Sequence, residues 1–256
     1  MYLYLWYFVI LSFLGWCLEV TFHAVKCGKF VNRGFLAGAV CPIYGVSFVL
    51  ARLLFNRVID TWLVLFLLSM LLATAVELMT GFLMDRIFDN KWWDYSNEKF
   101  NLYGYICLKF SLAWGLIATL ALKLAEPLRY LIELIPKPLG LGVLTLFLSV
   151  FALDLTTSVL LALSFSKRLK RLSDASEIIS SAIETGSDLV GVGVYKGASR
   201  VKLSYDKLLS KATLLGERFI DAFPSMRSHR YEGALEAVKK RLGQNREAKK
   251  TNGKEK

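Results

Sequence analysis

The stretch WLVLFLLSMLLATAVELMTGFL at residues 62–83 is apolar almost throughout and holds one charged side chain, Glu77. A helix needs roughly 20 apolar residues to cross a hydrocarbon layer about 30 Å thick. The apolar residues are continuous and do not alternate with polar ones, which indicates a helix and not a barrel strand. The stretch therefore predicts a membrane-spanning helix that carries one carboxyl group.

Four further apolar runs of similar length lie at 2–22, 36–55, 102–124 and 139–163, in a chain that is 55% hydrophobic. The first run has no Lys or Arg before it and no small-residue cleavage site, so we expect a retained helix and not a signal peptide. The sequence predicts an all-α fold, a polytopic membrane helix bundle with about five transmembrane helices in contact with the lipid bilayer.

Basic residues predict the orientation and the domains. Residues 164–256 hold 20 of the 32 basic and 11 of the 21 acidic residues, a net charge of +9. Because such segments stay in the cytoplasm, we expect a cell-membrane protein with an external N-terminus and a cytoplasmic C-terminus. We expect a transmembrane domain at 1–163, a basic helical cytoplasmic region at 164–243 and a disordered tail at 244–256. Within that region, 199–222 and 228–243 have helical periodicity, and GSDLVGVGVYKGASR at 186–200, with glycines at 191, 193 and 197, suggests a hinge or loop.

Several function classes lack their motifs. The chain has no GxxxxGK[ST] sequence, so it does not itself hydrolyse ATP by the P-loop route, and the glycines at 191–197 do not form a dinucleotide fingerprint. The basic tail lacks a module that reads nucleic acid. His23 and Cys27 share a helical face without further ligands at a recognisable spacing. We expect no cofactor, no metal and no nucleic-acid partner.

Polar groups gather on one side of the predicted bundle. Glu19, Glu77 and Asp154 fall in the cytoplasmic halves of three runs, and charged groups at that depth usually face a bundle interior or water. The loop KWWDYSNEKFNLYGYIC at 91–107 and the turn at 32–33 open on the same side. This arrangement predicts a cytoplasm-facing polar pocket.

We expect specific roles in this pocket. The loop tryptophans wall it, Asp94, Tyr95 and Asn101 supply hydrogen bonds, and Arg33 pairs with the buried Glu77. A purely structural interpretation stays open. In it, Asp94 and Ser96 form local turns and Asn101 caps the helix of the fourth run. Arg33 then pairs with Glu19, and the tryptophans lie at the membrane interface.

Four ordered motifs resemble the CmpB-type ABC-transporter permease family. They are GWCLEV (15–20), NRGFLAGAVCPIYG (32–45), ELMTGFLMDRIF (77–88) and WWDYSNEKFNLYGYICLKFS (92–111). The resemblance covers most of residues 1–125. It implies a transporter permease with a separate ATPase subunit, and it implies a homo-oligomer if five helices are too few for one permease.

The family pattern matches Glu19, Asn32, Arg33, Gly34, Pro42, Tyr44, Gly45, Glu77, Trp93, Asp94, Tyr95, Ser96, Asn101, Gly104, Cys107 and Ser111. Our candidate ligand-binding residues are Glu19, Asn32, Arg33, Tyr44, Glu77, Trp93, Asp94, Tyr95, Asn101 and Ser111. Two positions depart from the pattern: Gly38-Ala39 stands where the family has Gly-Pro, and Tyr105 stands where it has an arginine. If that arginine binds an anion, Lys109 is the nearest substitute.

Two other function classes remain alternatives. A membrane-embedded lipid-handling enzyme would use Arg33 to hold an anion and Glu77 or Asp94 to accept a proton. The quoted motifs hold no nucleophile–base pair, because the histidines are His23 and His229, so whether the chain is an enzyme stays open. A scaffold or regulator that recruits partners through its tail is the third class.

Overall fold

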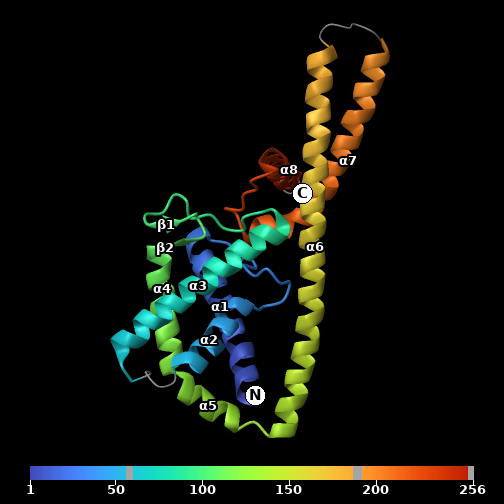
Figure 1. Cartoon of the computed structure of the whole chain (residues 1–256). Helices are drawn as coiled ribbons and strands as arrows, with labels where there is room; N and C mark the ends of the chain where they lie inside the picture. Colours follow the sequence, from blue (N-terminus) through green and yellow to red (C-terminus); the bar gives the residue numbers. More distant parts are fainter. Residues whose placement is uncertain (56–59, 187–191, 253–256) are drawn as a thin grey trace. The chain divides into compact units, whose positions relative to one another are not determined.

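The computed structural model describes residues 1–55, 60–186 and 192–252 and is nearly all-α (Figure 1). The elements in chain order are α1 (Tyr2–Cys27), α2 (Pro42–Phe55), α3 (Trp62–Phe88), β1 (Asn101–Leu102), β2 (Ile106–Cys107), α4 (Leu108–Lys123), α5 (Ala125–Glu133), α6 (Lys137–Gly186), α7 (Val192–Ala222) and α8 (Glu232–Asn252). The expected all-α character is confirmed apart from the short antiparallel hairpin of β1 and β2.

Three helices of the described residues are long and apolar enough to cross a membrane: α1, α3 and the part of α6 up to Ser181. Helices α4 and α5 meet at an angle of 45° and qualify as a fourth span only when taken together. The apolar helix α2 has 14 residues, which is short for a span of about 20 residues. The chain is therefore a membrane protein, and its described residues contain three or four such spans, so the expected count of about five is not confirmed.

The second predicted run fails as one helix because its first part is not helical. Helix α1 ends at Gly28, whose φ of 66° lies in the left-handed region that glycine adopts without strain. Helix α2 then begins at Pro42, a residue suited to the first helical position because it has no N–H to leave unpaired. We call residues 29–41 between them the non-helical segment. It lies against α1, where the Cys41 N–H donates to the Ser12 carbonyl at 2.9 Å.

The described residues group into two compact units. Unit 1 comprises Met1–Met84 and Trp92–Ser158, and unit 2 comprises Asp85–Lys91 and Val159–Lys256. In unit 1, α1 and α2 cross closely because two glycines leave room. A side chain at Gly45 would meet Ser12 and Phe8, and one at Gly15 would meet the ring of Tyr44.

The buried core of unit 1 lies where α1 and α2 meet α3, α4 and α5. It consists of Tyr7, Phe48, Ala51, Leu65, Leu122, Ala125 and Ile132. The Tyr7 hydroxyl donates to the Ala125 carbonyl at 3.0 Å, and Arg52 of α2 forms an ion pair with Glu126 of α5. The end of α2 is thus fixed beside the first half of α1 and the start of α5.

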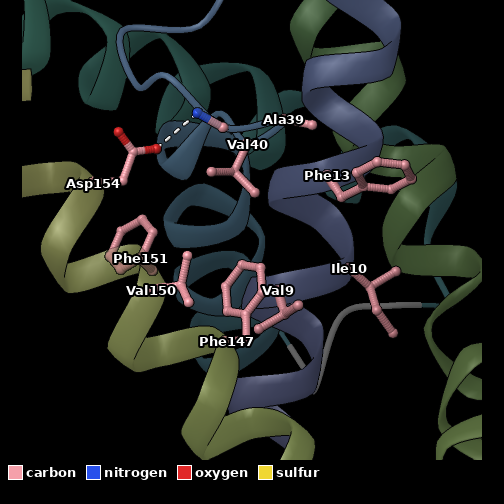
Figure 2. A pocket seen from close by; sticks show the side chains of 10 residues that line it. Val9, Ile10, Phe13, Ala39, Val40, Phe147, Val150, Phe151 and Asp154 are labelled. Carbon is pink, nitrogen blue, oxygen red and sulfur yellow. Dashed lines mark hydrogen bonds between the residues drawn. The ribbon is translucent and has the colours of Figure 1, made fainter.

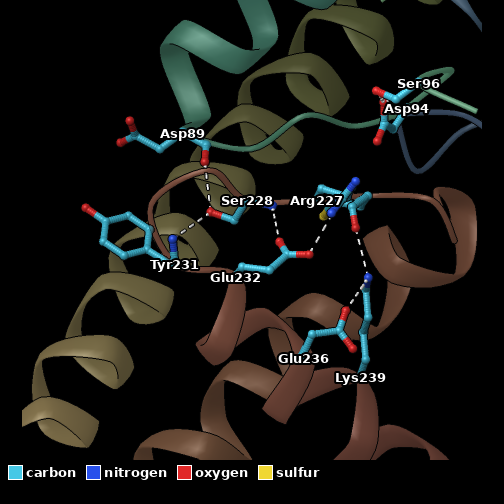
Figure 3. Close-up of polar contacts among 10 residues, drawn as sticks. Asp89, Asp94, Ser96, Arg227, Ser228, Tyr231, Glu232, Glu236 and Lys239 are labelled. Carbon is cyan, nitrogen blue, oxygen red and sulfur yellow. Dashed lines mark hydrogen bonds and ion pairs between the residues drawn. The ribbon is translucent and has the colours of Figure 1, made fainter. Parts of the chain in front are cut away.

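Unit 2 joins the end of α3 to the C-terminal region through polar contacts (Figure 3). Lys91 and Arg227 exchange two backbone hydrogen bonds of 2.8 and 2.9 Å. The Ser228 hydroxyl donates to the Asp89 carbonyl at 3.1 Å and accepts from the Tyr231 N–H at 3.2 Å, while Glu232 accepts from the Ser228 N–H at 2.7 Å. These bonds satisfy N–H groups just before α8, where a helix start leaves them without intrahelical partners.

The C-terminal helices differ in extent from the predicted ones. Helix α7 begins at Val192, so 192–198 are helical although the glycine spacing suggests a loop. Helix α8 runs from Glu232 to Asn252 and continues into the stretch expected to be disordered. Residues 187–191 of the predicted loop and 253–256 of the predicted tail lie outside the described residues.

Candidate functional site

Two carboxyl groups in unit 1 each accept a hydrogen bond from a tyrosine. Glu19 of α1 accepts from the Tyr44 hydroxyl of α2 at 2.5 Å. Glu77 of α3 accepts from the Tyr95 hydroxyl of the 91–107 loop at 3.2 Å. Both contacts join elements that are distant in sequence, and all four residues belong to the predicted pocket set.

The two pairs form one group of interacting side chains. Glu19 is an electrostatic neighbour of Glu77 and of both tyrosines. The ring of Trp114 in α4 lies edge-on to Tyr44, with 5.3 Å between centroids, and its indole is a neighbour of the Glu77 carboxyl group. We call these five residues, Glu19, Tyr44, Glu77, Tyr95 and Trp114, the carboxyl–tyrosine cluster. Trp114 was not predicted, because a tryptophan within an apolar helix carries no sequence signal that separates packing from binding.

Glu77 is buried, as expected, but its partner differs from the expected one. The residue is 8% exposed, and its Oε1 atom is the acceptor for Tyr95. Its Oε2 atom is buried without a hydrogen-bond partner. Across 1–55, 60–186 and 192–252 no ion pair joins Glu77 to a cation, so the predicted pairing with Arg33 is wrong.

A glycine in α3 provides the space on which the 91–107 loop lies. A Cβ atom at Gly81 would stand 3.1 Å from ring atoms of Trp93 and Tyr105. The Trp93 indole donates to the Tyr105 carbonyl at 2.8 Å, which connects the two ends of the loop. Trp93 therefore packs against α3 one helical turn beyond Glu77.

Tyr95 is fixed from both sides. Its N–H donates to the Gly104 carbonyl at 2.8 Å, and its ring stacks on Phe110 of α4 at 4.8 Å. Burial, and secondarily the neighbouring Glu77, raises the pKa of the Tyr95 phenol well above its ordinary value. The phenol therefore stays protonated and remains a hydrogen-bond donor.

Asp94 and Asn101 shape the loop. The Asp94 carboxylate accepts from the Ser96 N–H at 3.0 Å and from the Ser96 hydroxyl at 2.5 Å. Asn101 donates to the Glu98 carbonyl at 2.8 Å and accepts from the Gly104 N–H at 3.2 Å. These contacts are those of turn formers, as the structural interpretation expects for Asp94. Asn101 does not cap α4, whose N-cap is Cys107 without a side-chain hydrogen bond. Ser111 lies buried in the first turns of α4, with 6% of its surface exposed.

Asn32 organises the non-helical segment. Its Oδ1 atom accepts from the Trp16 indole at 2.7 Å and from the Gly34 N–H at 2.9 Å, and its amide donates to the Ala37 carbonyl at 2.9 Å. Arg33 is an electrostatic neighbour of Cys41. The segment meets the other loop through the rings of Phe35 and Trp92, at 5.1 Å.

Asp154 serves the non-helical segment instead of the carboxyl–tyrosine cluster. Its two carboxylate oxygens accept from the backbone N–H groups of Ala37 at 3.0 Å and Gly38 at 2.8 Å. The Ser158 hydroxyl donates to the same carboxylate at 3.1 Å. Of the three acidic residues expected to lie together, only Glu19 and Glu77 therefore belong to the cluster.

A cavity of about 400 Å³ lies beside Asp154 (Figure 2). Its lining is apolar except for Asp154 and comprises Val9, Ile10, Phe13, Gly38, Ala39, Val40, Phe147, Val150, Phe151 and Asp154. We call it the apolar groove. In Figure 2 the α6 side chains line one wall and the α1 side chains the other, with the non-helical segment at the end near Asp154.

The carboxyl–tyrosine cluster offers carboxylate acceptors, phenol donors and aromatic faces. Among the residues that the structure places, no three His, Cys, Asp or Glu side chains come close enough together to hold a metal ion.

Comparison with known proteins gives one match. The family model described as "Putative ABC-transporter type IV" matches residues 6–159, which include the carboxyl–tyrosine cluster, the non-helical segment and the apolar groove. The search of curated proteins and the search of solved structures each gave no match. Because the family model matches more than half of the chain, the chain belongs to the family described as "Putative ABC-transporter type IV".

Proposed function

We propose that the chain is the membrane-embedded permease subunit of an ABC-type transporter and that the carboxyl–tyrosine cluster is its polar site. The observation that carries this proposal is the meeting of Glu19 and Glu77, from different helices, among side chains of five elements. Ionisable groups within membrane helices are rare, and they mark ion and substrate pathways more often than structural sites. Family membership supports the same assignment.

In this proposal the site faces the cytoplasm. The tail charge of +9 favours a cytoplasmic C-terminus. The end of α2, the start of α5 and the first half of α1 lie together, as Tyr7–Ala125 and Arg52–Glu126 show, and we assign that end to the external side. The non-helical segment and α2 together return the chain to that side. The 91–107 loop then belongs to the cytoplasmic side, next to Glu77.

ATP hydrolysis must come from a separate ATPase subunit, because the chain has no P-loop. The test is to isolate the tagged full chain from its native membranes after mild cross-linking and to measure ATP hydrolysis by the isolated complex. We expect a P-loop protein at a fixed ratio to the chain, together with ATPase activity that changes in Glu77→Gln. A complex without ATPase activity and without a P-loop protein contradicts the proposal.

Orientation is tested separately with single cysteines in a variant that lacks Cys17, Cys27, Cys41 and Cys107. Ser96→Cys should react with a membrane-impermeant maleimide only after the cells are opened, and Lys137→Cys should react in intact cells. The reverse pattern contradicts the cytoplasmic placement of the site.

A lipid-handling role is the second candidate, and the apolar groove favours it. The groove takes its walls from α1 and α6, two helices long enough to span the membrane, and Phe13 and Val150 are 47% and 57% exposed. An acyl chain fits such walls because it exchanges one apolar environment for another. Native mass spectrometry of the solubilised protein should then show retained lipid, with less retained in Ala39→Phe and no change in Leu146→Phe, a variant of α6 outside the groove.

A further inference from the structure

The carboxyl–tyrosine cluster contains more negative charge than its contacts offset. Glu77 is 8% exposed, and its Oε2 atom has no hydrogen-bond partner. Glu19, the second carboxyl group, lies close enough to act on it electrostatically. A buried carboxylate with a second carboxyl group nearby is disfavoured in its ionised form, because it lacks water and is repelled by the neighbouring negative charge.

We propose that Glu77 is a proton-binding site, with its Oε2 atom as the atom that receives the proton and Glu19 as the neighbouring carboxyl group. The proton comes from solvent hydronium, which leaves as water, and no other bond is made or broken. The inference rests on the polar site of the proposed function, but it requires neither an ATPase partner nor a transported substrate.

The hydrogen bonds of the cluster identify the receiving atom. Tyr44 already donates to Oε1 of Glu19, and Tyr95 already donates to Oε1 of Glu77. Oε2 of Glu77 is buried and has no hydrogen-bond partner of good geometry, although the Trp114 indole acts on the same carboxyl group. A proton there removes one of the two negative charges without displacing either tyrosine.

The groups that face this site come from each surrounding element. Glu19 lies on α1, Tyr44 on α2, Tyr95 on the loop and Trp114 on α4, and the thiols of Cys41 and Cys107 are neighbours of the tyrosines. Among the described residues, no cation is an electrostatic neighbour of Glu77 itself. His23 of α1 is an electrostatic neighbour of Glu19, and Arg33 of the adjoining non-helical segment acts on both His23 and Cys41. A proton on Glu77 therefore adds positive charge at the buried carboxyl group without a rearrangement of the side chains around it.

Proton binding would connect two parts of unit 1. Glu19 and Tyr44 join α1 to α2, while Glu77 and Tyr95 join α3 to the loop. Loss of the proton restores repulsion between the two pairs and favours their separation. The cluster thus has the composition of a proton relay in a transporter, where acidic side chains inside the membrane exchange protons.

The test is infrared spectroscopy of the full chain in lipid nanodiscs, titrated between about pH 5 and pH 8. We expect the carbonyl stretch of a protonated carboxylic acid in the wild-type protein and its loss in Glu77→Gln. Glu98→Gln, which removes the carboxylate that pairs with Lys109 on the loop surface, is the matched control and should keep the band.

Two further variants should move the pH midpoint of this band in opposite directions. Tyr95→Phe removes a donor that stabilises the carboxylate, so the band should persist to higher pH. Glu19→Gln removes the neighbouring negative charge, so the band should disappear at lower pH. A purely structural role for either residue would not produce opposite shifts.

Labelling with a hydrophobic carbodiimide, which reacts with the protonated carboxyl group, provides a second readout and should modify Glu77. If the wild-type protein has no protonated-acid band across the titration, or if the band survives Glu77→Gln, the proton site is refuted. That result would leave the transporter assignment standing, because the assignment depends on the ATPase subunit. Conversely, if the isolated complex contains no ATPase but the protonated-acid band is present as expected, the transporter assignment is refuted and the proton site is supported.

Discussion

The Gly38 N–H donates a hydrogen bond of 2.8 Å to the carboxylate of Asp154, which lies 116 positions away in α6. The other oxygen of this carboxylate accepts from the Ala37 N–H at 3.0 Å. Non-helical backbone within a membrane needs partners from the protein, because lipid supplies none. The carboxylate of Asp154 on α6 thus accepts hydrogen bonds from two N–H groups of the non-helical segment. These two bonds replace the intrahelical hydrogen bonds that the segment lacks.

Asp154→Ala should lower the free energy of unfolding by on the order of 3 kcal/mol, since it leaves two N–H groups without their charged acceptor. Asp154→Asn should give a smaller loss, because its amide oxygen still accepts one bond. Thermal unfolding in detergent measures both. Asp174→Asn, an exposed position of α6, is the control and should unfold like the wild type. An unchanged melting temperature in Asp154→Ala would show that the segment does not depend on α6.

Gly45→Val should destabilise the crossing of α1 and α2. The new side chain would collide with Ser12 and Phe8, and overpacking of this kind costs about 1–3 kcal/mol. Gly142→Ala is the matched control, since nothing stands within 4 Å of a Cβ atom there and alanine favours a helix. We expect a lower melting temperature for Gly45→Val and an equal or higher one for Gly142→Ala. Equal stability of Gly45→Val and the wild type would refute the close crossing.

Gly81→Leu should displace Trp93 and Tyr105 from α3, because even a Cβ atom at this position lies 3.1 Å from both rings. Limited proteolysis should then cut the 91–107 loop faster than in the wild type. Met79→Leu changes an exposed residue two positions earlier in the same helix and should leave the cleavage rate unchanged. Equal cleavage of Gly81→Leu and the wild type would mean that the loop does not lie on this helix.

Ser228→Ala should weaken the start of α8 within unit 2. The variant loses the contacts of the hydroxyl with Asp89 and Tyr231, and the loss of a helix-capping side chain typically costs about 1 kcal/mol. Hydrogen exchange at 226–236 should therefore become faster. Ser225→Ala removes an exposed hydroxyl three residues earlier and should have little effect. Similar exchange rates in both variants would argue against the cap.

The long helices were predictable because their apolar runs are uninterrupted. Helices α1, α3 and α6 contain the runs 2–22, 62–83 and 139–163, each with several further helical residues. Hydropathy alone did not reveal the non-helical part of the second run, because an apolar residue counts equally in a helix and in an extended segment. Pro42 was the available signal, because proline suits the first position of a helix, and it marks the start of α2.

The fourth run shows a similar limit. The hairpin occupies 101–107, and α4 begins only at Leu108. Gly104, whose φ is 70°, and Tyr103, whose φ is 51°, form the turn. A sequence window averaged over 20 residues does not resolve so short a structure.

The candidate site was predicted in part. Burial of Glu77 followed from the cost of exposing a carboxylate to lipid, and its contact with the 91–107 loop followed from the topology. The hydrogen-bond partner of Glu77 was not predictable, because an arginine such as Arg33 and a tyrosine such as Tyr95 can both donate to a carboxylate. Only the three-dimensional path of the 91–107 loop places Tyr95 beside Glu77. The role of Asp154 was missed for the same reason, because backbone N–H groups carry no sequence signal.

The most direct test of the carboxyl–tyrosine cluster is a double-mutant cycle between Glu77→Gln and Tyr95→Phe, measured as the free energy of unfolding in detergent micelles. If the Tyr95 hydroxyl and the Glu77 carboxyl group are bonded as described, the two effects should be non-additive by about 0.6 kcal/mol or more, the average for hydrogen bonds inside membrane proteins. A control cycle of Tyr95→Phe with Glu98→Gln should be additive. Additive effects for Glu77 and Tyr95 would contradict the cluster.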